Sequence, residues 1–246
     1  MSTLGERMKM YEGCSKISLM RRSPVIIRID GRAFHTFTKH MHRPFDAAIE
    51  RSMLMTMQYL CKNISGCVLG YTQSDEISLV LCDYQTIDRQ PWFGNELQKL
   101  VSVSASIATL AFNREFAEYA DVLGSPYKEA LLIGATFDAR AFTLPRDEVT
   151  NYLIWRQQDA SRNSIQSVGH ANFSDKEMHG LNMDEIQEKL FQEKGINWGE
   201  DFDTYQKRGA CCIKMETDGI SEWTIDFDIP IFTQDRNYIE RCITFE

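Results

Sequence analysis

Long hydrophobic runs are missing from this sequence. No apolar stretch approaches the roughly 18 residues that a membrane-spanning helix needs. No secretory signal pattern is recognisable either. Hydrophobic residues make up 43% of the chain and charged residues 25%, values that are ordinary for a globular protein. We therefore expect a cytoplasmic protein that has no membrane partner.

Several motifs that would define other classes of protein are also missing. The seven cysteines are scattered without C-x-x-C spacing, which indicates neither a disulfide framework nor a zinc site. The phosphate-binding motif G-x-x-x-x-G-K-[ST] does not occur, so the chain is not a P-loop NTPase. No repeat, low-complexity tract or Pro/Gly linker interrupts the 246 residues, and this length favours one catalytic unit.

The net charge does not favour a protein that binds nucleic acid through bulk positive charge. Lys and Arg number 27 against 35 Asp and Glu, which gives −8. The distribution is uneven, because residues 1–43 hold nine Lys or Arg and three acids. A basic N-terminal part on an acidic chain is consistent with a local phosphate site.

Apolar periodicity predicts an alternation of strands and helices. Expected strands cover 25–30, 67–71, 76–82 and 133–144, and expected amphipathic helices cover 44–63 and 95–118. The order β-α-β-β-α-β is that of the split βαβ, or ferredoxin-like, unit. The predicted fold is therefore α+β, with an antiparallel sheet in a ferredoxin-like core over residues 1–146.

The remaining residues, 147–246, predict a helical and β-hairpin extension packed on that core. A helix with a polar second half is expected over 147–169. Another is expected to begin after Asn182, where Glu185 completes a capping box, and to end at Gly195. Residues 210–216 and 222–227, joined through Asp218-Gly219, are typical of a hairpin.

Acidic side chains stand at two strand ends that this topology brings together. Asp30 ends the first strand, while Asp75 and Glu76 lie at the tip of the hairpin between the next two. Mg²⁺ prefers carboxylate oxygens together with substrate phosphates, and a pair of such ions suits nucleotidyl transfer. Gly31 permits close backbone approach, so its carbonyl is a further candidate ligand. Either motif alone is more often a simple turn, but their juxtaposition favours a metal site. Such a site on this topology predicts a polymerase-palm-like catalytic core over residues 1–146.

Basic and hydroxyl residues near these acids are candidates for binding a triphosphate. Arg32, Lys39 and Arg43 follow the first strand, and Ser74 precedes Asp75. His35, His40 and His42 lack the paired scaffold of a zinc site, so phosphate contact or solvation explains them better.

With these residues the chain resembles the tRNA-histidine guanylyltransferase family, 3′-to-5′ polymerases that add nucleotides at an RNA 5′ end. The specific segments are RIDGRAFHTFTK (28–39), QSDEISLVL (73–81) and YLIWRQQDASRNS (152–164). The resemblance implies that Asp30, the Gly31 carbonyl and Asp75 bind two Mg²⁺ ions, with Glu76 as a neighbouring catalytic acid. It implies ATP and GTP, or other NTPs, as substrates and tRNA as the partner.

The resemblance also assigns further binding residues. Nucleotide contacts would fall on Gly31, Arg32, Ala33, Phe34, His35, Arg43, Ser74, Lys99 and Asn163, and RNA contacts on Lys194 and Lys207. A homotetramer or homodimer is expected, from the family and from the apolar segment 210–232.

Some positions depart from the pattern of the guanylyltransferases proper. Ser161 and Ser164 replace a histidine and an asparagine, Thr72 replaces a glycine and Arg43 a lysine. These changes resemble the guanylyltransferase-like branch, which implies template-dependent repair of tRNA 5′ ends. A 5′-monophosphate would first be activated with ATP and then attacked by the 3′-hydroxyl of an incoming nucleotide. Phosphoryl transfer of this kind needs no protein nucleophile.

Two other functions stay open at the level of sequence. A palm-type nucleotide cyclase would use equivalent carboxylates. A non-catalytic RNA-binding module would have no use for Asp30, Asp75 and Glu76 together, and the acidic balance disfavours it.

Overall fold

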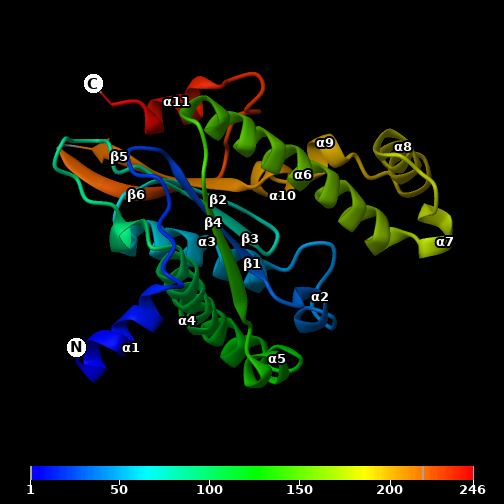
Figure 1. Cartoon of the computed structure of the whole chain (residues 1–246). Coiled ribbons are helices and arrows are strands. Elements are labelled where there is room, and N and C mark those ends of the chain that lie inside the picture. Colours follow the sequence, from blue (N-terminus) through cyan, green and yellow to red (C-terminus); the bar gives the residue numbers. More distant parts are fainter. Residues whose placement is uncertain (1, 218, 246) are drawn as a thin grey trace.

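The computed structural model describes residues 2–217 and 219–245, which form a mixed α+β structure around one six-stranded sheet (Figure 1). The strands are β1 (Val25–Gly31), β2 (Cys67–Gln73), β3 (Glu76–Leu81), β4 (Phe137–Thr143), β5 (Ala210–Thr217) and β6 (Ile220–Asp226). They follow the order β4-β1-β3-β2-β5-β6, and every neighbouring pair is antiparallel.

The predicted β-α-β-β-α-β order is confirmed. Helix α3 (Ala47–Asn63) joins β1 to β2, and α4 (Leu97–Leu123) lies between β3 and β4. The alternation of side chains along each strand sends Ile27, Ile29 and Leu79 to the face that α3 and α4 cover. Ile26 and Val80 point to the opposite face.

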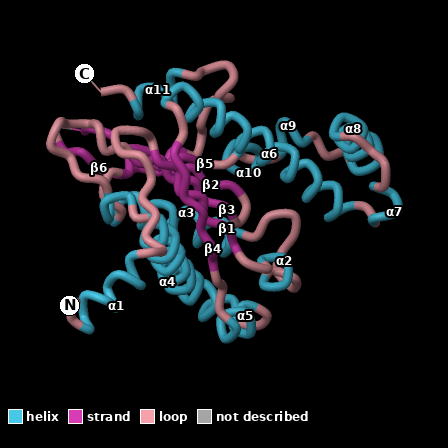
Figure 2. Tube along the Cα trace, viewed as in Figure 1, coloured by secondary structure: helices cyan, strands magenta, loops and turns pink. Residues whose placement is uncertain are grey.

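The opposite face is covered by α6 (Arg146–Asn172) and α11 (Asn237–Ile243), as Figures 1 and 2 show. Val149 and Leu153 of α6 pack there with Tyr71 and Phe232. The far half of α6 forms a separate apolar cluster with α8 (Met183–Lys194), through Val168 and Leu190 among others. The two halves of α6 thus serve different cores.

The C-terminal hairpin continues the sheet, because β5 pairs with β2 from Leu69↔Ile213 to Thr72↔Ala210. The predicted hairpin is confirmed, although Asp218 at its turn lies outside the described residues. The division into core and extension at 146 stays a prediction. So does the oligomer, although the segment from β5 to residue 231 exposes Met215, Ile220, Phe227 and Ile231.

Several predicted boundaries are wrong. The helix expected over 95–118 runs from Leu97 to Leu123. The helix expected from Pro44 begins at Ala47, because Asp46 caps it by accepting hydrogen bonds from the amides of Ala48 and Ile49. Ile133, expected in a strand, ends helix α5 (Tyr127–Ile133), and Gly134 with φ +76° turns the chain toward β4. The capping box of Asn182 and Glu185 is confirmed.

Short elements complete the structure. These are α1 (Leu4–Gly13), α2 (Phe34–Phe37), η1 (Trp92–Asn95), α7 (Asp175–Met178), α9 (Trp198–Asp201) and α10 (Thr204–Arg208). Within residues 2–217 and 219–245, no helix combines the length and the apolar character needed to cross a membrane.

Candidate active site

The end of β1 meets the turn between β2 and β3. Asp30 stands opposite Glu76 in the β1–β3 ladder, and the Gly31 amide donates to the Asp75 carbonyl at 3.0 Å. The predicted juxtaposition of Asp30 with Asp75 and Glu76 is therefore observed. It follows from the antiparallel register, which sets the C-terminal end of one strand beside the N-terminal end of the other.

Local backbone geometry fixes this corner. The turn residue Ser74 has φ +51°, and its hydroxyl donates to Asp75 Oδ1 at 3.1 Å. At position 31 a Cβ atom would lie 2.3 Å from the ring of Phe34, so only glycine fits under that ring. Burial raises the pKa of Asp75, and the nearby charge of Asp30 raises it further. The corner thus concentrates negative charge in a partly desolvated place.

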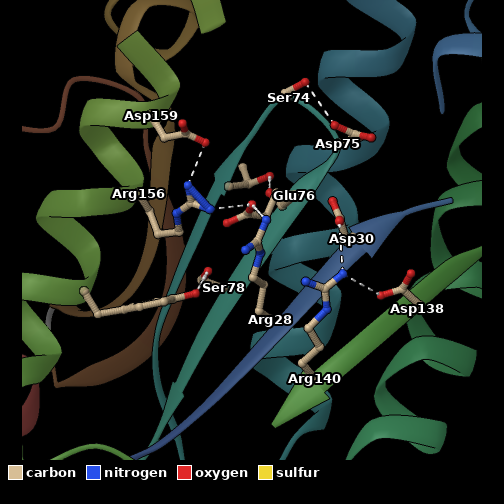
Figure 3. Close-up of polar contacts among 12 residues, drawn as sticks. Arg28, Asp30, Ser74, Asp75, Glu76, Ser78, Asp138, Arg140, Arg156 and Asp159 are labelled. Atoms are coloured by element: carbon tan, nitrogen blue, oxygen red, sulfur yellow. Dashed lines mark hydrogen bonds and ion pairs between the residues drawn. The ribbon is translucent and has the colours of Figure 1, made fainter. Parts of the chain in front are cut away.

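Glu76 is held by two arginines (Figure 3). Its Oε2 lies 2.6 Å from Arg28 and 3.1 Å from Arg156, and Arg156 also contacts Asp159 at 2.6 Å. The side chains of Arg156 and Glu76 are 3% and 5% exposed. Burial raises the pKa of Glu76, and the two guanidinium groups oppose that shift. Glu76 thus faces arginines, and the catalytic role predicted for it stays a prediction.

The donor set at this corner is suited to Mg²⁺. Among the residues that the structure describes, no three Asp, Glu, His or Cys side chains converge as a metal-ligand group. Two carboxylates and a glycine carbonyl are nevertheless what Mg²⁺ takes when substrate phosphates and water supply the other ligands. A cation would also relieve the repulsion that raises the pKa of Asp75. Arg140 lies 3.7 Å from Asp30 and 3.5 Å from Asp138, so its positive charge balances part of the negative charge at this corner.

A cleft of about 880 Å³ opens beside the two aspartates. Its walls come from the α2 region, α3, the β2–β3 turn, α6 and α10. The predicted site residues that line it are Asp30, Gly31, Ala33, Phe34, His35, Arg43, Ser74, Asp75 and Asn163. This volume lies within the range that is common for small-molecule and cofactor pockets.

Other predicted residues lie outside this lining. Arg32 is exposed, and its amide donates to the Thr136 carbonyl. Lys99 lies on the first turn of α4, with its amine 3.9 Å from Glu96 and 5.7 Å from the centre of the Phe93 ring. The structure does not bring Lys99 to the cleft, so its predicted triphosphate contact has no support from the geometry.

The two predicted RNA-binding lysines lie on the C-terminal extension. The amine of Lys194, at the end of α8, stands 5.3 Å from the centre of the Phe173 ring. That of Lys207 donates to the Gly199 carbonyl. Their predicted contact with RNA stays a prediction.

Sequence reasoning did not single out Glu50, a cleft residue whose carboxyl is unusual. It lies on the apolar side of α3, and burial raises its pKa from 4.5 to about 7. The charges of Asp46 and Asp203 add to the shift, while a hydrogen bond from Gln206 opposes it. An acid at an otherwise apolar helical position is the signal that could have revealed it.

Glu50→Gln should flatten the pH dependence of stability. Because the folded pKa lies above the unfolded one, the native state binds more protons between pH 4.5 and about 7, and stability falls as pH rises through that window. Glutamine removes this slope. Urea unfolding at about pH 5 and about pH 8 measures it. The exposed α4 residue Glu118 supplies the matched control, Glu118→Gln, and equal slopes in both variants would contradict the assignment.

Comparison with known proteins identifies the family. A family model described as tRNAHis guanylyltransferase (Thg1) matches residues 5–145. The solved structure of a bacterial tRNA(His) guanylyltransferase (Thg1)-like protein in complex with ATP is 46% identical and covers 99% of this chain and 100% of its own, with a TM-score of 0.90. A second such structure, in complex with GTP, is 45% identical over 98% and 99% of the two chains, with a TM-score of 0.83.

A more distant relative supports the same assignment. The tRNA(His) guanylyltransferase of Schizosaccharomyces pombe is 29% identical over 231 residues, which cover 89% of this chain and 82% of that protein. The family model spans more than half of the chain, and the fold matches along nearly its full length. This protein therefore belongs to the tRNAHis guanylyltransferase (Thg1) family and is a Thg1-like nucleotidyltransferase.

Proposed function

We propose that this protein adds nucleotides to the 5′ end of tRNA in the 3′-to-5′ direction, directed by the opposing strand of the acceptor stem. The observation that carries the proposal is the pair of aspartates, Asp30 and Asp75, at the edge of a cleft whose volume is typical of cofactor pockets. The matches to Thg1-like proteins solved with ATP and with GTP support both nucleotides as substrates. The sheet order β4-β1-β3-β2 supports a polymerase-palm-like core.

In this proposal Asp30, Asp75 and the Gly31 carbonyl hold Mg²⁺. Bound there, the ions would supply charge neutralisation for the triphosphate and lower the pKa of an attacking hydroxyl. Ser74 and Arg43, which line the cleft on two sides, bind phosphate oxygens. Asn163 reaches the same space from α6, so three separate parts of the chain orient one nucleotide.

Three charged residues next to the two aspartates hold the surrounding backbone in place. The Arg28–Glu76–Arg156 cluster ties β1 and β3 to α6 beside Asp30, on the same face of the sheet. A rigid backbone there keeps the two aspartates at a fixed separation, and fixed positions are what phosphoryl transfer requires of the protein. Glu76 is therefore assigned a positioning role.

The decisive experiment uses a tRNA that lacks its first nucleotide and carries a labelled 5′-phosphate, with Mg²⁺, ATP and each NTP in turn. Wild-type protein should extend it by the nucleotide complementary to the opposing acceptor base. Asp30→Asn should abolish extension, because it removes a metal ligand without changing the shape of the side chain. Gel separation of the labelled products measures the outcome.

Changing the opposing base supplies the control for templating, since the added nucleotide should change with it. Addition of guanosine whatever the opposing base would show non-templated guanylylation instead. Formation of a cyclic nucleotide from NTP alone, without extension, would replace the proposal by a nucleotide cyclase.

A further inference from the structure

One face of α3 forms a wall of the cleft. Asp46, Ile49, Glu50, Met53 and Leu54 recur at helical spacing, and all five line the cavity. Ile49, Met53 and Leu54 make this wall apolar, so it is suited to the flat surface of a nucleobase. Ligand pockets typically combine such apolar walls with a few polar groups that fix orientation.

Asp46 is not free to be that polar group. Its Oδ1 accepts from the amides of Ala48 at 3.0 Å and Ile49 at 3.2 Å. Its Oδ2 accepts from the His42 amide at 3.0 Å and the Tyr127 hydroxyl at 2.6 Å. A carboxylate has about four positions at which it can accept hydrogen bonds, and in Asp46 all of these are occupied by donors from the helix start, the neighbouring loop and Tyr127.

Glu50, one turn later, keeps acceptor capacity. Gln206 Nε2 donates to its Oε2 at 3.3 Å, and Tyr205 lies beside the carboxyl. Gln206 is itself fixed, since its Oε1 accepts from the Asp203 amide at 3.3 Å. The carboxyl is thus oriented by α10 while part of its hydrogen-bonding capacity faces the cleft.

We propose that Glu50 reads the Watson–Crick edge of the purine nucleotide bound in this cleft. As a carboxylate it accepts from both the N1–H and the N2 amino group of guanine. As a carboxylic acid it donates to N1 of adenine and accepts from the N6 amino group. The protonation state of one side chain therefore selects between the two purines. This inference rests on the proposed function, because it assumes that the cleft binds nucleotides.

The environment of Glu50 keeps both forms accessible near neutral pH. Burial on α3 raises its pKa to about 7, with Asp46 on its own helix and Asp203 at the start of α10 adding negative charge. The Gln206 amide and the Tyr205 hydroxyl, which face it from α10, favour the ionised form. Thg1-like relatives solved with ATP and with GTP agree with a site that accepts either base.

The test is equilibrium binding of GTP and of ATP, with Mg²⁺ and without tRNA, at about pH 6 and about pH 8. The quantity of interest is the ratio of the two affinities. Phosphates, metal ligands and histidines affect both nucleotides alike and cancel in that ratio. In wild-type protein the ratio of GTP affinity to ATP affinity should rise by at least about tenfold from about pH 6 to about pH 8. A tenfold change corresponds to about 1.4 kcal/mol, near the lower end of what a bidentate contact to a base contributes.

Glu50→Gln should make the ratio independent of pH and shift it toward ATP, because the amide carries one donor and one acceptor at any pH. Glu118→Gln on the exposed side of α4 should behave as wild type. The pH series on the wild-type protein tests the inference even if Glu50→Gln does not fold.

The outcomes separate this inference from the proposed function. Binding of both nucleotides, with a ratio that neither pH nor Glu50→Gln changes, overturns the role of Glu50 and leaves tRNA extension untouched. Absence of nucleotide binding in the wild-type protein overturns both.

Discussion

Replacing Glu76 with methionine is expected to destabilise the protein by about 3–5 kcal/mol, the cost of removing one partner from a buried ion pair. The carboxylate lies between Arg28 and Arg156, at 2.6 and 3.1 Å. Arg28 also stands opposite Arg140 in the β1–β4 ladder, where like charges repel. Without Glu76, Arg28 loses the carboxylate that balances it. Urea unfolding followed by circular dichroism measures the change.

Two further variants make this expectation specific. Glu118→Met removes an exposed acid of α4 and should change stability by less than about 1 kcal/mol. The double variant Glu76→Met with Arg28→Met should recover part of the loss, because the uncompensated cation goes as well. A loss below about 1 kcal/mol for Glu76→Met alone would mean that the cluster adds little to the fold.

Asp75→Asn is expected to lower the rate of nucleotide addition by at least about 10³-fold, because a metal ligand contributes several kcal/mol to charge stabilisation. The same change should leave the metal-free fold as stable as the wild type, or more stable. Burial and the neighbouring charge of Asp30 raise the folded pKa of Asp75, so its ionised form costs stability above its unfolded pKa. Asparagine lacks that charge.

Single-turnover extension of labelled tRNA gives the rate, and urea unfolding in a chelating buffer gives the stability. Mg²⁺ should then stabilise the wild-type protein and have a smaller effect on the variant. A variant that loses activity only because it unfolds would contradict the assignment of Asp75 as a metal ligand. So would one that retains activity within about tenfold.

The sequence predicts those parts of the structure that depend on neighbouring residues in the chain, such as strands, helices and helix caps. Strand alternation and helical spacing predict the β-α-β-β-α-β order, and the antiparallel pairing of β1 with β3 in that topology brings Asp30 to Asp75. The capping box at Asn182 is likewise local. The start of α3 at Ala47 is harder to predict, because both Pro44 and Asp46 are start signals and only the aspartate caps the helix.

Contacts between distant segments could not be predicted in this way. Arg156 lies 80 positions from Glu76, and the polar character of its helix does not reveal which acid it meets. Glu50 meets Gln206 across 156 positions. The nucleotide contact predicted for Lys99 rests on the resemblance to the family and not on the position of the residue in the fold. The structure places Lys99 away from the cleft.

The pairing of β2 with β5 has a consequence for synthesis on the ribosome. Residues 69–72 of β2 can pair with residues 210–213 only after the latter have been synthesised. At about 5–20 residues per second, the chain between them takes on the order of ten seconds to emerge from the ribosome. During that interval β2 is an open sheet edge with apolar neighbours, a template for pairing with another nascent chain. Slower translation of the C-terminal third should therefore lower the soluble yield, and a chaperone that covers sheet edges should restore it.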